Sequence, residues 1–135
     1  MKAFKIDPKN KTIEEIVIDC WQDIYPHMSE ECGTFCCPVQ FENNDTIYAD
    51  DEGLFHIIEG GIIMKDWTYP IVGNTILIGE DSEGDMEDVK TSLEELQSKI
   101  IWVSKELCLK HKESILNDHQ YLDPNIFFNT QETTN

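Results

Sequence analysis

The sequence contains no arginine. All ten of its cationic side chains are lysines, they stand against 27 Asp and Glu residues, and the formal net charge is −17. Proteins that bind DNA or RNA hold the phosphates mostly with Arg and Lys. This charge and the absence of arginine therefore exclude direct binding of nucleic acid as an expected function.

Long apolar runs are also missing. No stretch approaches the roughly 20 apolar residues of a membrane-spanning helix, and the first residues, MKAFKIDPKNK, lack the apolar stretch of a signal peptide. The cysteines number five, so they cannot all pair within one chain, and thiols in the cytosol stay mostly reduced. We therefore expect a cytoplasmic protein with no membrane role.

Catalytic motifs are the third absence. The sequence has no Gly-x-Ser-x-Gly nucleophile elbow, no Walker loop and no Gly-x-Gly-x-x-Gly fingerprint. Carboxylates are so numerous that any two could be named as an acid/base pair, so none is singled out. We expect a protein that is not an enzyme and needs no cofactor.

What the sequence does contain is a strongly acidic middle. Between residues 40 and 95 there are 15 Asp and Glu against two lysines, while the flanking segments are nearly balanced. Such a concentration of negative charge favours cationic partners or metal ions. The apolar fraction of 40% nevertheless predicts a packed core rather than a disordered chain.

The residue pattern predicts one acidic α+β domain over residues 1–128 and a frayed polar tail over 129–135. Alternating residues predict an N-terminal β-hairpin over Lys2–Asp7 and Thr12–Ile18, followed by a meander of short antiparallel strands joined by acidic turns. The strands expected in the meander are Thr34–Phe41, Thr46–Ala49, Leu54–Ile58, Ile62–Trp67 and Asn74–Ile78. Because Pro38 cannot donate a backbone hydrogen bond, the first of these is expected at a sheet edge.

Two helices are expected. A short one covers Cys20–Met28, and one long C-terminal helix begins at Thr91 or Ser92, since apolar residues recur after it at helical spacing. Its stripe consists of Leu93, Leu96, Ile100, Val103 and Leu107. This stripe is expected to pack on the sheet. The alternative is that the helix outruns the sheet and pairs with a second copy, giving a homo-oligomer; the residues left for that pairing are Trp102, Leu109 and Leu116.

Four residues near the N-terminal helix, His27, Cys32, Cys36 and Cys37, could contribute to a zinc site. Cys32 and Cys36 have the spacing of half a zinc knuckle, but no second pair follows. Adjacent Cys36 and Cys37 would also face opposite sides of a strand. We therefore expect ordinary core or surface thiols here and assign no metal site, with metal binding by these four residues as the alternative.

Calcium is the other metal considered. Asp81, Glu83 and Asp85 are spaced like the start of an EF-hand loop, but Met86 and Ser92 stand where that loop needs glycine and glutamate. An organised EF-hand is therefore excluded, and only weak, adventitious binding of divalent ions by the loop remains.

The acidic turns are the predicted partner-binding surface. The residues assigned to it are Asp50, Asp51, Glu52, Glu80, Asp81, Glu83, Asp85, Glu87 and Asp88. Three aromatic residues, Tyr48, Trp67 and Tyr69, lie near the first of these turns in the predicted fold. An acidic rim with an aromatic floor can hold a cationic or heterocyclic ligand, and the alternative is that these aromatic side chains fill the core.

The segment Asp45–Leu54 (DTIYADDEGL) resembles the centre of a family of small acidic domain-of-unknown-function proteins carried mostly by bacteriophages and mobile elements of bacteria. Further segments match in order within residues 1–105: residues 6–8, residues 24–27 followed by Cys32, residues 70–74, 78–84 and 92–96. The Cys36-Cys37 pair and the long C-terminal extension depart from the family pattern. The resemblance implies a phage context and supplies no catalytic residues.

That context leads to the main functional hypothesis, because small acidic phage proteins often bind and disable host machinery. We expect a non-enzymatic counter-defence protein that inhibits a host protein with a basic surface, as a nucleic-acid mimic. One alternative is a small-molecule sponge that sequesters a signalling nucleotide of bacterial immunity, although the chain offers few cations for phosphate. Another is a regulatory or structural module whose charge only keeps it soluble.

Overall fold

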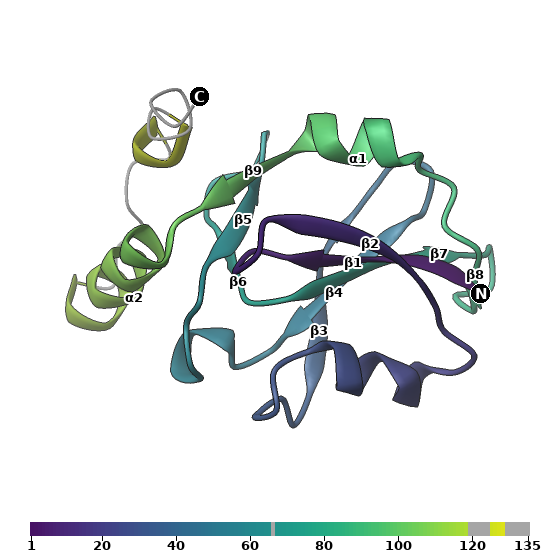
Figure 1. The fold of residues 1–135 in the computed structure, drawn as a ribbon, viewed down its shortest axis with the longest axis horizontal. Helices are drawn as coiled ribbons and strands as arrows, with labels where there is room; N and C mark the ends of the chain where they lie inside the picture. The colour runs from purple at the N-terminus through teal and green to yellow at the C-terminus, as the bar shows by residue number, and fades with distance from the viewer. Residues whose placement is uncertain (66, 119–124, 129–135) are drawn as a thin grey trace.

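The structure is a computed structural model that describes residues 1–65, 67–118 and 125–128 (Figure 1). These residues form an α+β fold with antiparallel sheets of short strands, which confirms the predicted fold class. The tail predicted at 129–135 lies outside the described residues.

A central sheet with strand order β2-β1-β7-β4-β3 occupies the middle of the fold. Its strands are β1 (Lys2–Asp7), β2 (Thr12–Val17), β3 (Phe35–Gln40), β4 (Thr46–Asp50) and β7 (Thr75–Glu80), and the short β8 (Met86–Glu87) pairs with β7. The N-terminal hairpin is confirmed. So is the edge position of β3, whose pairing with β4 shifts register between Cys36 and Val39, on either side of Pro38.

A second, smaller sheet has the order β6-β5-β9. Its strands are β5 (Gly61–Met64), β6 (Ile71–Val72) and β9 (Ile100–Val103). All four residues of β5 are buried, as expected for a strand covered on both faces. The division into two sheets was not predicted from the sequence.

Alternation along the strands separates the buried side chains into layers. On one face of the central sheet, Phe4 and Leu77 join a cluster with Ile62 of β5 and with Leu96 of helix α1 (Leu93–Lys99). Figure 1 shows α1 lying along one side of that sheet. The second sheet and α1 therefore cover the same face.

The opposite face of the central sheet is covered by the 3-10 helix η1 (Trp21–His27). Ile76 and Ile78 of β7 cluster there with Ile24 of η1. On the second sheet, Ile63 joins a separate cluster with Cys108 of helix α2 (Lys105–Asp118). The order of layers is thus η1, central sheet, second sheet with α1, and α2.

The predicted single C-terminal helix is wrong. It is interrupted by β9, so that α1 ends at Lys99 and α2 begins at Lys105. The interrupting residues, Ile-Ile-Trp-Val, are β-branched or aromatic and favour a strand, and they pair with β5. The hydroxyl of Ser104 then accepts a hydrogen bond from Leu107 N at 3.2 Å and begins a new helix. The short helix predicted over Cys20–Met28 is present as η1.

Two smaller predictions also differ from the structure. Leu54–Ile58 is not a strand; it contains the 3-10 turn η2 (Gly53–Phe55) and irregular backbone. The acidic segment after Glu80, for which no strand was predicted, includes β8. On α2, Leu109 and Leu116 are 44% and 48% exposed, so pairing with a second copy through this helix stays a prediction.

Among the described residues, no helix combines the length and apolarity needed to cross a membrane.

Candidate functional site

The predicted acidic residues lie at two opposite ends of the central sheet. We call Asp50–Glu52 the acidic turn and Glu80–Asp88 the acidic hairpin. Because β4 and β7 are antiparallel, Thr46 pairs with Ile78 near the acidic hairpin, whereas Ala49 pairs with Thr75 near the acidic turn. Four residues of extended chain span about 13 Å. The structure therefore forms two separate acidic regions, not one continuous face.

The acidic hairpin is organised by its own hydrogen bonds. The Asp81 carboxylate accepts from the backbone N–H groups of Glu83 and Asp85, both at 2.9 Å, and Asp81 N donates to Asp85 O at 2.8 Å. Before this turn, Gly79 pairs with Glu87, and a Cβ on Gly79 would lie 2.2 Å from Asp88 O. The two arms of the hairpin are thus in close backbone contact.

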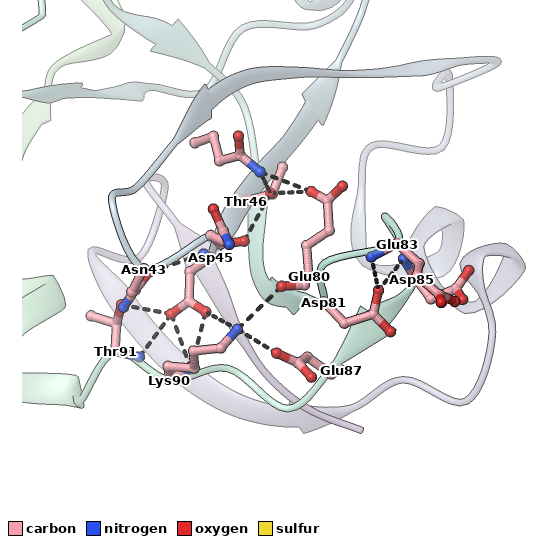
Figure 2. A network of polar contacts seen from close by, with 12 residues as sticks. Asn43, Asp45, Thr46, Glu80, Asp81, Glu83, Asp85, Glu87, Lys90 and Thr91 are labelled. Atoms are coloured by element: carbon pink, nitrogen blue, oxygen red, sulfur yellow. Dashed lines mark hydrogen bonds and ion pairs between the residues drawn. The ribbon is translucent and has the colours of Figure 1, made fainter.

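A buried carboxylate anchors the chain that leaves the acidic hairpin. Asp45 is fully buried in the turn before β4. It accepts hydrogen bonds from Lys90 N at 3.0 Å, from Thr91 N at 2.7 Å and from the Thr91 hydroxyl at 2.6 Å (Figure 2). The Lys90 ammonium lies 3.8 Å from the same carboxylate. Asp45 therefore fixes residues 90 and 91 against the end of β4.

Several predicted site residues are used to hold this end together. The Glu80 carboxylate accepts from Thr46 Oγ1 at 2.9 Å and from Gln40 Nε2 at 3.0 Å. Glu87 pairs with Lys90 Nζ at 2.5 Å, and Asp88 accepts from the backbone N–H of Lys2 at 2.8 Å. These carboxylates still carry charge, but their positions are set by partners within the chain.

Two acidic side chains project from the hairpin without such constraints. Glu83 and Asp85 are exposed at the turn between β7 and β8. Backbone groups join them to the hairpin: both N–H groups donate to the Asp81 carboxylate, and Asp85 O accepts from Asp81 N. Figure 2 shows both residues beside Asp81 at the far side of the network from Asp45. They are the residues of this end that are placed for a partner.

At the acidic turn, the Asp50 carboxylate is paired within the chain with His56. The carboxylate lies 2.5 Å from Nδ1 of His56, and the Asp50 side chain is only 6% exposed. It also accepts from Glu52 N at 3.0 Å. Asp51 and Glu52 are exposed. The structure thus leaves two of the three predicted carboxylates at the surface of this turn.

The hydrogen bond from His56 to the Asp50 carboxylate raises the pKa of the imidazole above its ordinary value of 6.5. A raised folded-state pKa gives a stabilisation that is complete below about pH 6.5 and is lost as the pH rises through the folded value. We therefore expect His56→Gln to destabilise the protein more at pH 5.5 than at pH 9. Urea unfolding at the two pH values measures this, and an NMR titration of His56 at or below its ordinary pKa would contradict it.

The three predicted aromatic residues do not share one pocket. Tyr48 lies on the η1 side of the central sheet, with its ring 5.3 Å from that of Phe35, and burial raises its pKa to about 12. Trp67 and Tyr69 are neighbours with ring centroids 5.3 Å apart. They nevertheless line different cavities.

The larger cavity, of about 680 Å³, lies between the β3–β4 turn, the end of β5 and α1. Trp67 and Phe41 contribute aromatic surface, and Lys65 and Lys99 also line it, with Lys99 Nζ 5.2 Å from the centre of the Phe41 ring. The smaller cavity, of about 240 Å³, lies beside the acidic turn and includes Tyr69. Asp51 and Glu52 of the acidic turn also line this smaller cavity, whereas the other two predicted aromatic residues, Tyr48 and Trp67, do not.

The cysteines suggested as zinc ligands make different local contacts. Cys32 Sγ donates to Thr34 O at 3.3 Å, and Cys37 is hydrogen-bonded to Tyr48. Burial, followed by the nearby Asp51 carboxylate, raises the pKa of the Cys36 thiol to about 11. His27 lies at the end of η1. Within the described ranges, no three His, Cys, Asp or Glu side chains are grouped so as to hold a metal ion.

Comparisons with models of protein families, with curated proteins and with solved structures found no match to this chain.

Several residues that shape these sites were not found from the sequence. Asp45 stood in a run of acidic turn residues with nothing to mark it as buried, and His56 is six positions from the carboxylate it pairs with. Phe55 and Lys112 meet only through the packing of α2 near η2. Each of these contacts depends on chain segments whose proximity a single sequence does not report.

Proposed function

We propose that this chain is a non-enzymatic phage accessory protein that binds and inhibits a host protein through its acidic surface. The observation that carries the proposal is the acidic hairpin, in which a hydrogen-bonded turn holds Glu83 and Asp85 exposed. Because the backbone of this turn is already ordered, it loses little freedom when the two carboxylates meet lysine or arginine, so more of the attraction contributes to binding. The phage context and the cytoplasmic location come from the sequence interpretation.

The inhibited surface would be one that normally holds nucleic acid. Duplex DNA presents one negative charge per about 1.7 Å of its axis, and a chain of net charge −17 without arginine offers a dense negative field of its own. The two acidic ends would each cover part of a basic groove. The chain would then act as a nucleic-acid mimic by occupying the site rather than by chemistry.

Charge reversal at the acidic hairpin tests this proposal. Glu83→Lys with Asp85→Lys should weaken capture of basic DNA-binding proteins by about tenfold or more, because like charges then meet across the interface. The immobilised protein is exposed to a bacterial lysate treated with nuclease, and captured proteins are identified by mass spectrometry at about 50 mM and 500 mM salt. Capture by the natural sequence should fall at the higher salt, where screening is stronger.

The matched control is Glu14→Lys with Glu30→Lys, which makes the same change in net charge at exposed positions outside both acidic ends. Asp81 is left unchanged because its carboxylate holds the turn. Capture that is indifferent to salt, or that falls equally in both double variants, would count against the hairpin as the binding surface.

A second candidate function is favoured by the larger cavity. Its volume of about 680 Å³ lies within the roughly 300–1,000 Å³ of small-molecule sites. Lys65 and Lys99 could hold phosphate, and Trp67 and Phe41 could contact a base, which suits a sponge for a signalling nucleotide. Glu42 and Glu95 line the same cavity and oppose an anion there. Native mass spectrometry with nucleotides separates the two proposals, since the main one involves no stoichiometric adduct.

A further inference from the structure

The smaller cavity is a cleft between the acidic turn and helix α2. Its volume is about 240 Å³, below the roughly 300–1,000 Å³ of typical small-molecule sites. Leu54, Ile71 and Ile115 give it apolar walls, and Phe55 and Tyr69 add aromatic rings. A cleft of this size suits one long side chain of another protein better than a nucleotide.

The rim of the cleft is negatively charged. Asp51 and Glu52 line it and are exposed, whereas the charge of Asp50 faces His56. The position of the rim is fixed, because a Cβ on Gly53 would lie 3.0 Å from the backbone oxygen of Val72. Gly53, which directly follows the acidic turn, is therefore in close contact with β6, whose residues Ile71 and Val72 also line the cleft.

A cation of the chain itself already lies beside one of the aromatic rings that line the cleft. Nζ of Lys112, on α2, lies 6.0 Å from the centre of the Phe55 ring, and that ring is 64% exposed. An ammonium at this distance from an aromatic face is attracted by the ring quadrupole. This contact is a second observation, independent of the acidic residues, that the mouth of the cleft favours positive charge.

We propose that this cleft receives an arginine side chain of the basic protein that the chain binds, an inference that rests on the proposed function. The methylene stem would lie against the apolar walls, and the guanidinium would reach Asp51 and Glu52. Its planar shape stacks on aromatic rings and its five donors match adjacent carboxylates, so arginine fits better than lysine. The cleft would thus be a specific anchor, whereas the acidic hairpin supplies general attraction.

The probe for this site is a capped arginine amide, with the capped amides of lysine and of citrulline as comparisons. Citrulline keeps the shape of arginine without its charge. In an NMR titration of the ¹⁵N-labelled protein, arginine amide should shift the backbone signals of Asp51, Glu52 and Gly53. Its Kd should be at least about tenfold lower than that of citrulline amide, with lysine amide between them.

Two pairs of variants locate the binding. Asp51→Asn with Glu52→Gln should reduce arginine binding to the level of citrulline, whereas Glu83→Gln with Asp85→Asn at the other end should leave it unchanged. Lys112→Gln removes the internal competitor and should tighten binding a few-fold. Because all of these positions lie at the surface, an unchanged NMR spectrum elsewhere verifies that each variant is folded.

The cleft assignment is overturned if arginine and citrulline bind alike, or if the hairpin variants weaken arginine binding as much as the rim variants do. Loss of the cleft with continued salt-sensitive capture of basic proteins would leave the proposed function standing. If arginine amide binds the cleft while capture of basic proteins fails, the proposed function is wrong and the guanidinium site remains.

Discussion

Replacing Asp45 with alanine should lower the free energy of unfolding by about 3–5 kcal/mol, because buried hydrogen-bond donors lose a charged acceptor. The side chain is fully buried, and its carboxylate accepts from Lys90 N, Thr91 N and the Thr91 hydroxyl. Alanine leaves these donors without that acceptor and also removes one of the two carboxylates near the Lys90 ammonium, the other being Glu87. Domains of this size are stable by only about 5–15 kcal/mol, so the expected loss is large.

Urea unfolding followed by tryptophan fluorescence measures this change. Asp45→Asn should lie between the natural protein and Asp45→Ala, because one carboxyl oxygen is retained and the other becomes an NH₂ donor. The control is Glu83→Ala, which should change stability by no more than about 0.5 kcal/mol because that side chain is exposed. A loss below about 1 kcal/mol for Asp45→Ala would show that the buried carboxylate is not the anchor of residues 90 and 91.

Replacing Gly79 with alanine should destabilise the protein by about 3 kcal/mol and separate β8 from β7, because the obstacle to the new methyl group is backbone. The added Cβ would lie 2.2 Å from Asp88 O and 2.9 Å from both Asp88 C and Glu87 O. A flexible side chain could move away, but these are backbone atoms of Glu87, which pairs with Gly79, and of Asp88, which follows it. Amide hydrogen exchange at residues 79–88 should therefore become faster as well.

Gly33→Ala is the matched control for this prediction. A Cβ on Gly33 would meet no atom within 4 Å, and no positive φ is required there. Alanine should be neutral at this position or stabilise the protein by about 0.4–1 kcal/mol, because it reduces the freedom of the unfolded chain. If the two glycine variants had equal stability, the close approach between β7 and β8 would be refuted.

The sequence predicted those parts of the fold that depend on local patterns. The N-terminal hairpin follows from alternation around a turn-rich segment, and Pro38 correctly indicated an edge strand. The C-terminal stripe misled because Ile100 and Val103 satisfy helical spacing but are buried as residues of a strand. Residues 100–103 form a strand because they pair with β5. The order of strands across a sheet cannot be read from local periodicity.

The candidate site was predictable only as a list of residue types. The charge of the turns follows from composition, but their placement at opposite ends follows from the antiparallel register of β4 and β7. Likewise, Tyr69 lies beside the acidic turn in the structure, whereas Tyr48 lies on the other face of the sheet. Some carboxylates pair with another side chain of the same chain, as Asp50 does with His56. These pairs depend on the packed structure.

The place of β7 between β1 and β4 has a consequence for synthesis on the ribosome. Ala3 of β1 pairs with Ile78 of β7. In the central sheet, β1 therefore lacks one of its two neighbouring strands until β7 has been synthesised. Until Glu80 has left the exit tunnel, the nascent hairpin carries the apolar side chains of Phe4 and Ile6 without the strand that completes their layer. Such long-range pairing is slow, because a large loop must close first. The central sheet can therefore assemble only after β7 has been synthesised.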